Sequence, residues 1–236
     1  MSKNLSNNKP VNHYLPNNRP LKDIRYALFD MDGTLLDLAF DQYIWLTLLP
    51  KLWAERHQES LEDASIELRA FYLQHHATLN WYSTAFWAEK LDIDPYQLQY
   101  ENQQRITARP HCFELLQGLQ QRGIECWLVT NADEKSLVLK LENIPLRPYF
   151  KHIVSSQMLG FAKEQQGFWQ KLQALHNFDP SQSVLIDDNY GVLNSSKQFG
   201  IAHQISILQP DSSDNSARQT DDFIHLDRLD DLLKLF

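Results

Sequence analysis

The chain has 236 residues, which is enough for one large domain or for a core with an inserted subdomain. Its net charge of −8 argues against a protein that binds nucleic acid polymers through a basic surface. Two cysteines are too few for a disulfide framework, and no apolar stretch approaches the length of a membrane span, so we expect a cytoplasmic protein without a membrane partner.

The first segment of the chain, residues 1–20, holds six asparagines and three prolines and shows no apolar period. This composition predicts a flexible N-terminal arm.

From residue 24 onward, short continuous apolar runs alternate with helical patterns. Continuous runs are typical of strands that are buried on both faces of a parallel sheet. Strands are predicted at 26–29, 126–129, 152–155, 184–186 and 203–208, with a short edge strand at 223–226. Helices are predicted at 112–122, 133–142, 163–176 and 191–199, with a closing helix at 227–236. This alternation predicts an α/β fold with a doubly wound parallel sheet.

One stretch, residues 41–108, interrupts the alternation with an all-helical pattern that contains four of the six tryptophans. Helices are predicted at 40–49, at 51–57 continuing as 61–76, at 83–91 and at 95–106. Pro50 should break the first helix, whereas Pro95 suits a first turn with Asp94 as its N-cap. We therefore divide the chain into an α/β core (21–40 and 109–236) and an inserted helical subdomain (41–108).

Two pairs of aspartates follow predicted strands. Asp30 and Asp32, in the stretch Asp30-Met31-Asp32-Gly33-Thr34, lie two residues apart, so in an extended chain they share one face. Taken alone, such a pair also suits a strand-end turn in which aspartates cap loops. Asp187 and Asp188 end another strand, and the carboxyl ends of parallel strands meet at one edge of the sheet.

Four converging carboxylates require a counter-charge. Each like-charge pair at ~4 Å costs about 4 kcal/mol at an effective dielectric constant near 20. A cluster of oxygen ligands indicates Mg²⁺ as the balancing cation.

Thr130, Asn131 and Lys163 are further candidates, because a hydroxyl, an amide and an ammonium group can hold phosphate oxygens. Thr130-Asn131 also suits a simple helix cap, and a single lysine is usually a solvated residue.

These residues, in this order, resemble the haloacid-dehalogenase-like (HAD) superfamily of phosphohydrolases, over nearly all of residues 26–208. Asp30 to Thr34 matches the first motif, Thr130-Asn131 the second, Lys163 the third and Asp187-Asp188 the fourth. The inserted helices resemble the C1-type cap of that superfamily. Three stretches (30–45, 79–91 and 160–169) are also similar to the purine 5′-nucleotidase subgroup that acts on GMP and IMP, with Phe161-Ala162 where an aromatic–proline pair is expected.

The resemblance implies a Mg²⁺-dependent phosphomonoesterase that works through an aspartyl-phosphate. Asp30 is then the nucleophile and Asp32 the general acid and base. The metal ligands are Asp30, the backbone carbonyl of Asp32, and Asp187 and Asp188, with the direct ligand of the last pair left open. Thr130, Asn131 and Lys163 bind the phosphoryl oxygens.

The expected substrate is a small phosphomonoester, with a purine mononucleotide as the first choice. A sugar-phosphate phosphatase or phosphomutase of the same superfamily is the alternative. A non-catalytic sensor is disfavoured because none of the aspartates is missing. The sequence does not indicate an oligomeric state.

Overall fold

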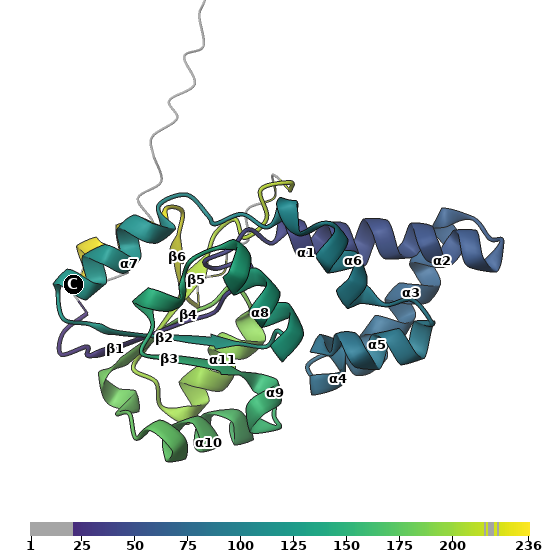
Figure 1. Ribbon diagram of the computed structural model, residues 1–236. Coiled ribbons are helices and arrows are strands. Elements are labelled where there is room, and N and C mark those ends of the chain that lie inside the picture. Colours follow the sequence, from purple (N-terminus) through teal and green to yellow (C-terminus); the bar gives the residue numbers. More distant parts are fainter. Residues whose placement is uncertain (1–20, 215, 217–219, 221) are drawn as a thin grey trace, which may run out of the picture.

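The computed structural model describes residues 21–214, 216, 220 and 222–236, so the arm predicted over 1–20 lies outside the described residues. Six strands form one parallel sheet in the order β3-β2-β1-β4-β5-β6 (Figure 1). The strands are β1 (Tyr26–Phe29), β2 (Glu125–Thr130), β3 (His152–Ser155), β4 (Ser183–Ile186), β5 (His203–Ile207) and β6 (Ile224–Leu226). The predicted α/β sheet is confirmed, including β6 as an edge strand.

Helices cover both faces of this sheet because successive residues of its central strand are buried on opposite sides. Ala27 and Phe29 belong to one cluster of buried apolar residues, while Leu28 belongs to a second. The first face carries α7 (Cys112–Gln121) and α8 (Glu134–Asn143), and the second carries α9 (Ser156–Leu159), α10 (Gln166–His176) and α11 (Tyr190–Phe199). The sheet is therefore doubly wound, as the alternating sequence pattern predicts.

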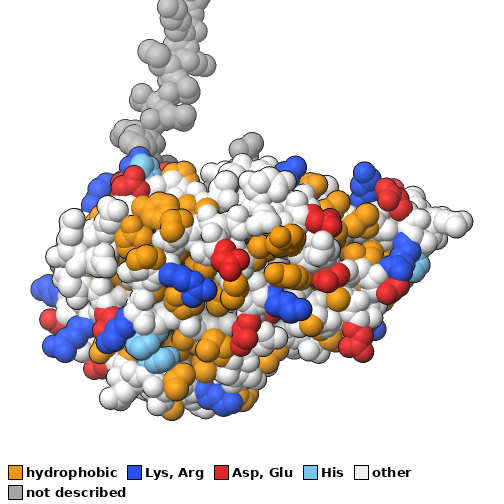
Figure 2. Space-filling view, in the orientation of Figure 1, with side chains coloured by type: hydrophobic (Ala, Val, Ile, Leu, Met, Phe, Trp, Pro, Cys, Tyr) orange, Lys and Arg blue, Asp and Glu red, His pale blue; other side chains and the backbone are white. Residues whose placement is uncertain are grey.

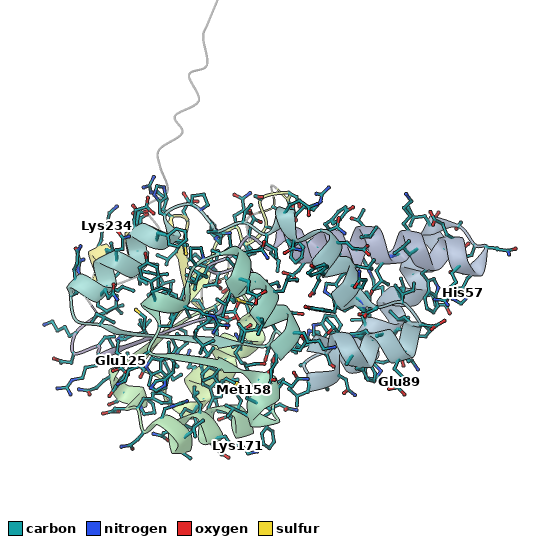
Figure 3. All side chains as sticks on the ribbon, in the orientation of Figure 1. His57, Glu89, Glu125, Met158, Lys171 and Lys234 are labelled. Carbon is teal, nitrogen blue, oxygen red and sulfur yellow. The ribbon has the colours of Figure 1, made fainter. Side chains whose placement is uncertain are left out.

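Between β1 and β2 the chain forms a helical unit that lies beside the sheet, on the right of Figure 1. Its α-helices are α1 (Ala39–Tyr43), α2 (Leu49–His57), α3 (Leu61–His75), α4 (Leu79–Tyr82), α5 (Thr84–Leu91) and α6 (Pro95–Glu101). The prediction of an inserted all-helical region is confirmed. In Figure 3, His57 and Glu89 mark its outer end, and Glu125 marks the amino end of β2.

The chain passes into and out of the helical unit along two adjacent segments. Leu36 pairs with Ala108 as an antiparallel bridge, and the Asp37 amide donates to the Thr107 carbonyl at 3.0 Å. The two crossings are therefore hydrogen-bonded to each other.

The first helix of the unit shows that the predicted break at Pro50 is wrong. A π-helical segment (Ile44–Leu48) joins α1 to α2 without interruption, and the Leu49 amide bonds to the Ile44 carbonyl five residues back. Proline breaks a helix because it lacks an amide proton and crowds the preceding turn. Here Pro50 falls in the first turn of α2, where the hydrogen-bond pattern changes from π to α, so the missing donor is tolerated.

The predicted continuation from 57 to 61 is also wrong. Gln58 has a φ of 56° and ends α2, and Ser60 caps a new helix by accepting from the Asp63 amide at 3.1 Å. The cap predicted at Asp94 is confirmed by its bond from the Tyr96 amide at 2.9 Å. The short helix α4 was not predicted.

Two helical predictions in the core need correction. The closing segment (Leu229–Leu235) is a 3₁₀ helix rather than an α-helix. Helix α10 begins at Gln166, so Lys163 lies in the turn before it, where the Asn131 side chain accepts from the Lys163 amide at 2.9 Å.

The surface carries charges of both signs, interspersed with hydrophobic side chains over the face in Figure 2. Within the described residues, no helix is both long and apolar enough to cross a bilayer.

Candidate active site

The register of three central strands brings the chemically active residues to one edge of the sheet. Phe29 pairs with Leu128 of β2 and with Ile186 of β4. Asp30 therefore follows the end of β1 and Asp187 follows the end of the neighbouring strand β4, at the same level of the sheet. One cavity of about 840 Å³ lies between this edge and the helical unit. All seven residues singled out from the sequence line it: Asp30, Asp32, Thr130, Asn131, Lys163, Asp187 and Asp188.

The acidic cluster has the composition of a hard-cation site. Asp30, Asp187 and Asp188 each offer a carboxylate oxygen, and these atoms lie within 4.8 Å of one another. Mg²⁺ binds oxygen ligands at about 2.0–2.1 Å, which puts opposite ligands roughly 4 Å apart. Small side-chain adjustments would let the three carboxylates share one such ion, so the residues present fit Mg²⁺.

Gly33 lets the loop after β1 approach this cluster. Its φ is +84°, which favours glycine, and a Cβ added here would lie 2.8 Å from both Cγ and Oδ2 of Asp188. The glycine of the first motif is therefore required by space as well as by backbone conformation.

Lys163 supplies a positive charge to two of the three carboxylates, Asp30 and Asp187. Its side chain is 1% exposed, and its ammonium group donates to Asp30 Oδ1, to Asp187 Oδ2 at 2.7 Å and to the Val129 carbonyl at 3.1 Å. Because a buried lysine is stable only when paired, this geometry explains why the chain tolerates a fully buried ammonium group.

Burial and charge crowding perturb the acidic groups. Burial raises the pKa of Asp30 to about 8; the carboxylates of Asp187 and Asp32 add to the rise, and Lys163 opposes it. Burial likewise raises the pKa of Asp187 to about 6, with Lys163 again opposing. Burial thus disfavours the ionised forms of Asp30 and Asp187, and a cation bound between them would favour these forms.

The Thr130-Asn131 pair lies at the carboxyl end of β2, but it does not cap the next helix. Asp133 caps α8 by accepting from the Ser136 amide at 2.9 Å. Asn131 instead orders the loop around Lys163: its Oδ1 accepts from the Lys163 amide, and its Nδ2 donates to Glu164 Oε2 at 3.0 Å. Thr130 Oγ1 accepts from the Ala132 amide at 3.0 Å.

The helical unit reaches the site through two polar bridges that sequence reasoning missed. Tyr82 donates its hydroxyl to Glu164, and burial together with the Glu164 charge raises the pKa of Tyr82, which keeps the hydroxyl protonated. Thr84 donates its amide and its hydroxyl to Asp133 Oδ2, at 2.6 and 2.5 Å. Figure 1 shows α4 on the side of the helical unit that faces α8 and α9 of the core.

A second buried lysine was also missed. Lys140 of α8 lies 2.7 Å from Asp32 Oδ1 and donates to both oxygens of Asp41 on α1, at 2.8 and 2.9 Å. The sequence holds one indication of its burial. Lys140 follows Leu137 by three residues, so it lies on the apolar face of the helix.

The helical unit contributes several large aromatic side chains to the cavity wall. Trp81 is half-buried and packs edge-on against Tyr72, with ring centroids 6.0 Å apart. Trp45 packs edge-on against the same ring at 6.0 Å. The tryptophans and tyrosines that the helical unit contributes to the lining are Trp45, Tyr72, Trp81, Tyr82 and Trp87.

Comparison with known proteins gives concordant matches. The sequence pattern of the family described as haloacid dehalogenase-like hydrolase matches residues 27–204. The GMP/IMP nucleotidase YrfG of Escherichia coli (strain K12) is 33% identical over 191 residues, which cover 81% of this chain and 86% of that protein.

Two more distant proteins are also similar. A phosphoglycolate phosphatase of Pseudomonas syringae pv. tomato is 25% identical over 185 residues, covering 75% of this chain and 67% of that protein. The crystal structure of a HAD phosphatase from Thermococcus onnurineus superposes with a TM-score of 0.74 at 18% identity, covering 90% of this chain and 97% of that one, which shows the shared fold.

Proposed function

The chain belongs to the haloacid dehalogenase-like hydrolases and is an enzyme of the phosphatase type, and from this premise we propose that it hydrolyses purine nucleoside 5′-monophosphates with Mg²⁺ as cofactor. One observation carries the proposal: a buried carboxylate cluster and a buried lysine from separate segments line one cavity between the sheet and the helical unit. The 33% identity to a protein named GMP/IMP nucleotidase supports the purine preference.

In the first half of the reaction, a carboxylate oxygen of Asp30 attacks the substrate phosphorus. The P–O bond to the leaving ester oxygen breaks as the new bond to Asp30 forms, giving an aspartyl-phosphate. Asp32 donates a proton to the departing oxygen, so the nucleoside leaves as a neutral alcohol. Both side chains line the cavity, which supports these roles.

In the second half, Asp32 removes a proton from a water molecule that attacks the same phosphorus. The bond between phosphorus and Asp30 breaks, which releases inorganic phosphate and restores the Asp30 carboxylate. Asp32 thus ends the cycle protonated, ready to serve again as the acid.

The metal ligands are proposed to be Asp30, Asp187, Asp188 and the backbone carbonyl of Asp32. Mg²⁺ held by these groups would supply electrostatic stabilisation of the transferring phosphoryl group. Lys163 contributes a fixed positive charge beside Asp30, and its many contacts hold that charge in place. Thr130 and Asn131 complete the phosphate site; both amide ends of Asn131 engage protein atoms, so its contribution includes ordering the Lys163 loop.

The helical unit, with boundaries at 41 and 108, is proposed to act as a C1-type cap that selects the leaving group. Its aromatic side chains lie opposite the carboxylates, and stacking on such rings is worth about 1–3 kcal/mol per base in nucleic-acid sites. The proposed substrate is a small phosphomonoester in the cytoplasm rather than a nucleic acid polymer, which agrees with the charge of −8.

A phosphatase for small phosphorylated acids or sugars is the second candidate, because the phosphoglycolate phosphatase of Pseudomonas syringae pv. tomato is also similar. Phosphate release from GMP, IMP, AMP, phosphoglycolate and sugar phosphates separates the two. Faster release from GMP and IMP supports the purine preference; equal rates would remove it and leave the phosphatase assignment intact. An isomeric sugar phosphate as product would indicate a phosphomutase instead.

The Asp30→Asn variant tests the nucleophile. An amide cannot form the aspartyl-phosphate, so turnover should fall to background while the fold, checked by circular dichroism, is retained. Asp94→Asn is the matched control, since asparagine caps a helix as well as aspartate does and Asp94 lies outside the cavity. Substantial residual activity of Asp30→Asn would overturn the assignment.

A further inference from the structure

Lys140 is a buried lysine that the proposed reaction does not use. Its side chain is only 2% exposed, although it belongs to α8, a helix that covers one face of the sheet. Lysine is almost never so buried without a partner. Its partners come from two other parts of the fold: Asp41 lies on α1 of the helical unit, and Asp32 lies in the loop after β1. All three side chains line the cavity.

Lys140 contacts its two carboxylate partners, Asp41 and Asp32, with different geometry. Both carboxylate oxygens of Asp41 accept directed hydrogen bonds from the ammonium group, at 2.8 and 2.9 Å. Asp32 Oδ1 lies 2.7 Å away as an ion pair without hydrogen-bond alignment. Asp41 therefore anchors the ammonium group through two directed bonds, and the anchored group lies against Oδ1 of Asp32.

The two oxygens of Asp32 differ in their surroundings. Oδ1 is buried against Lys140, whereas the side chain as a whole retains 19% exposure and lines the cavity. Holding Oδ1 fixes the rotation of the carboxyl group and leaves Oδ2 as the oxygen available to a bound substrate. Proton transfer needs this precision, because donor and acceptor must come within about 3 Å.

We propose that Lys140, anchored by Asp41, is a positioning residue that aims Oδ2 of Asp32 at the leaving-group oxygen. The inference rests on the proposed function, since it requires Asp32 to serve as the general acid. It adds that an element of the helical unit, α1, takes part in orienting the acid of the core.

The dependence on the leaving group tests this role. A nucleoside 5′-oxygen is a strongly basic leaving group and needs a proton, whereas 4-nitrophenolate leaves as a stable anion. The value of kcat/KM depends only on the steps up to departure of the leaving group. It therefore reports Asp32 as a general acid and not its later role as a general base. Lys140→Met should lower kcat/KM for GMP by about 10- to 100-fold and that for 4-nitrophenyl phosphate by less than about threefold.

Two further variants control for folding and for the loss of a lysine. Asp41→Asn keeps Lys140 beside Asp32 but removes the anchoring charge, and it should shift the same ratio of kcat/KM values in the same direction by a smaller factor. Lys135→Met changes an exposed lysine of the same helix outside the cavity and should leave the ratio unchanged. The Asp41→Asn measurement decides the question if Lys140→Met does not fold.

The outcomes separate the inference from the proposed function. A selective loss on GMP supports the positioning role. Equal losses on both substrates, or none, overturn it, because a merely structural contact would not distinguish leaving groups. If the wild-type enzyme hydrolyses neither substrate with Mg²⁺ present, the proposed function itself fails.

Discussion

The ammonium group of Lys163 donates to Asp30 from 133 residues further along the chain, and both groups are buried. Asp187 shares the same ammonium group. Two carboxylates thus share one ammonium group, and burial raises the pKa of Asp30 by more than the ion pair with Lys163 lowers it. This imbalance has a measurable effect on folding stability.

The first prediction concerns pH and stability in the absence of divalent cations. The pKa of Asp30 rises from 3.8 to about 8 on folding, so between these values the folded state holds more protons than the unfolded state. The contribution of Asp30 to the free energy of unfolding is therefore greatest below the lower value and is lost as pH rises toward the upper one. The melting temperature in EDTA should fall more steeply from about pH 5.5 to about pH 8 for the wild type than for Asp30→Asn.

Addition of Mg²⁺ should flatten the wild-type profile, because a bound cation stabilises the ionised carboxylate. Parallel profiles for the wild type and Asp30→Asn would contradict this account, since the variant lacks the titrating group.

The second prediction concerns Gly33. In Gly33→Ala, the new methyl group would lie 2.8 Å from the carboxyl carbon of Asp188, and alanine disfavours the φ of +84°. We expect loss of Mg²⁺-dependent activity together with roughly 1–2 kcal/mol of destabilisation from the backbone. Gly123→Ala is the matched control: its φ is +71°, but no atom lies within 4 Å of the added Cβ. Steady-state kinetics should show the control fully active; equal activity of the two variants would argue against the contact.

The third prediction concerns the hydroxyl that links the helical unit to the core. Tyr82→Phe removes the bond to Glu164, which keeps its contacts with Asn131 and Asn189. A hydrogen bond to a charged group contributes about 1.5–3 kcal/mol, so KM for GMP should rise by roughly 10-fold or more. Tyr149→Phe removes a hydroxyl that accepts from Gln117 elsewhere on the core and should leave KM unchanged. An unchanged KM in Tyr82→Phe would show that this bond does not contribute to binding.

The fourth prediction separates substrate stacking from core packing in the helical unit. Trp81 lines the cavity, whereas Phe86 packs against Trp87, with ring centroids 5.1 Å apart, and lies outside the cavity. Trp81→Ala should raise KM for GMP by about 5- to 100-fold while changing KM for 4-nitrophenyl phosphate much less. Phe86→Ala should lower the melting temperature without changing the ratio of the two KM values. If both variants change only stability, the purine does not stack on Trp81.

The sheet and the cluster at its edge could be predicted from the sequence because their signals are local. A continuous apolar run that ends in Asp30, and another that ends in Asp187, each indicate a buried parallel strand with a carboxylate at its end. Parallel topology then brings the two ends together. The sequence therefore suffices wherever strand order alone decides proximity.

The remaining features depend on contacts between distant segments. The pairing of Asp41 with Lys140 joins residues 99 positions apart, and no spacing rule connects them. Likewise, a proline breaks an ordinary α-helix, but the helix continues through Pro50 because the π-helical turn before it changes the hydrogen-bond pattern. The function of Asn131 as an organiser of the Lys163 loop follows from a bond that only the folded chain forms.

The paired crossings at Leu36–Ala108 and Asp37–Thr107 constrain how the helical unit can move. Two adjacent segments that are hydrogen-bonded to each other bend together about a common axis. We therefore expect the helical unit to rotate as a rigid body rather than to unfold. The strands that carry the carboxylates need not separate while it opens. The Thr84 amide, which donates from the helical unit to Asp133 of the core, and the amide hydrogens at the crossings should accordingly exchange with solvent long before those of β1, β2 and β4.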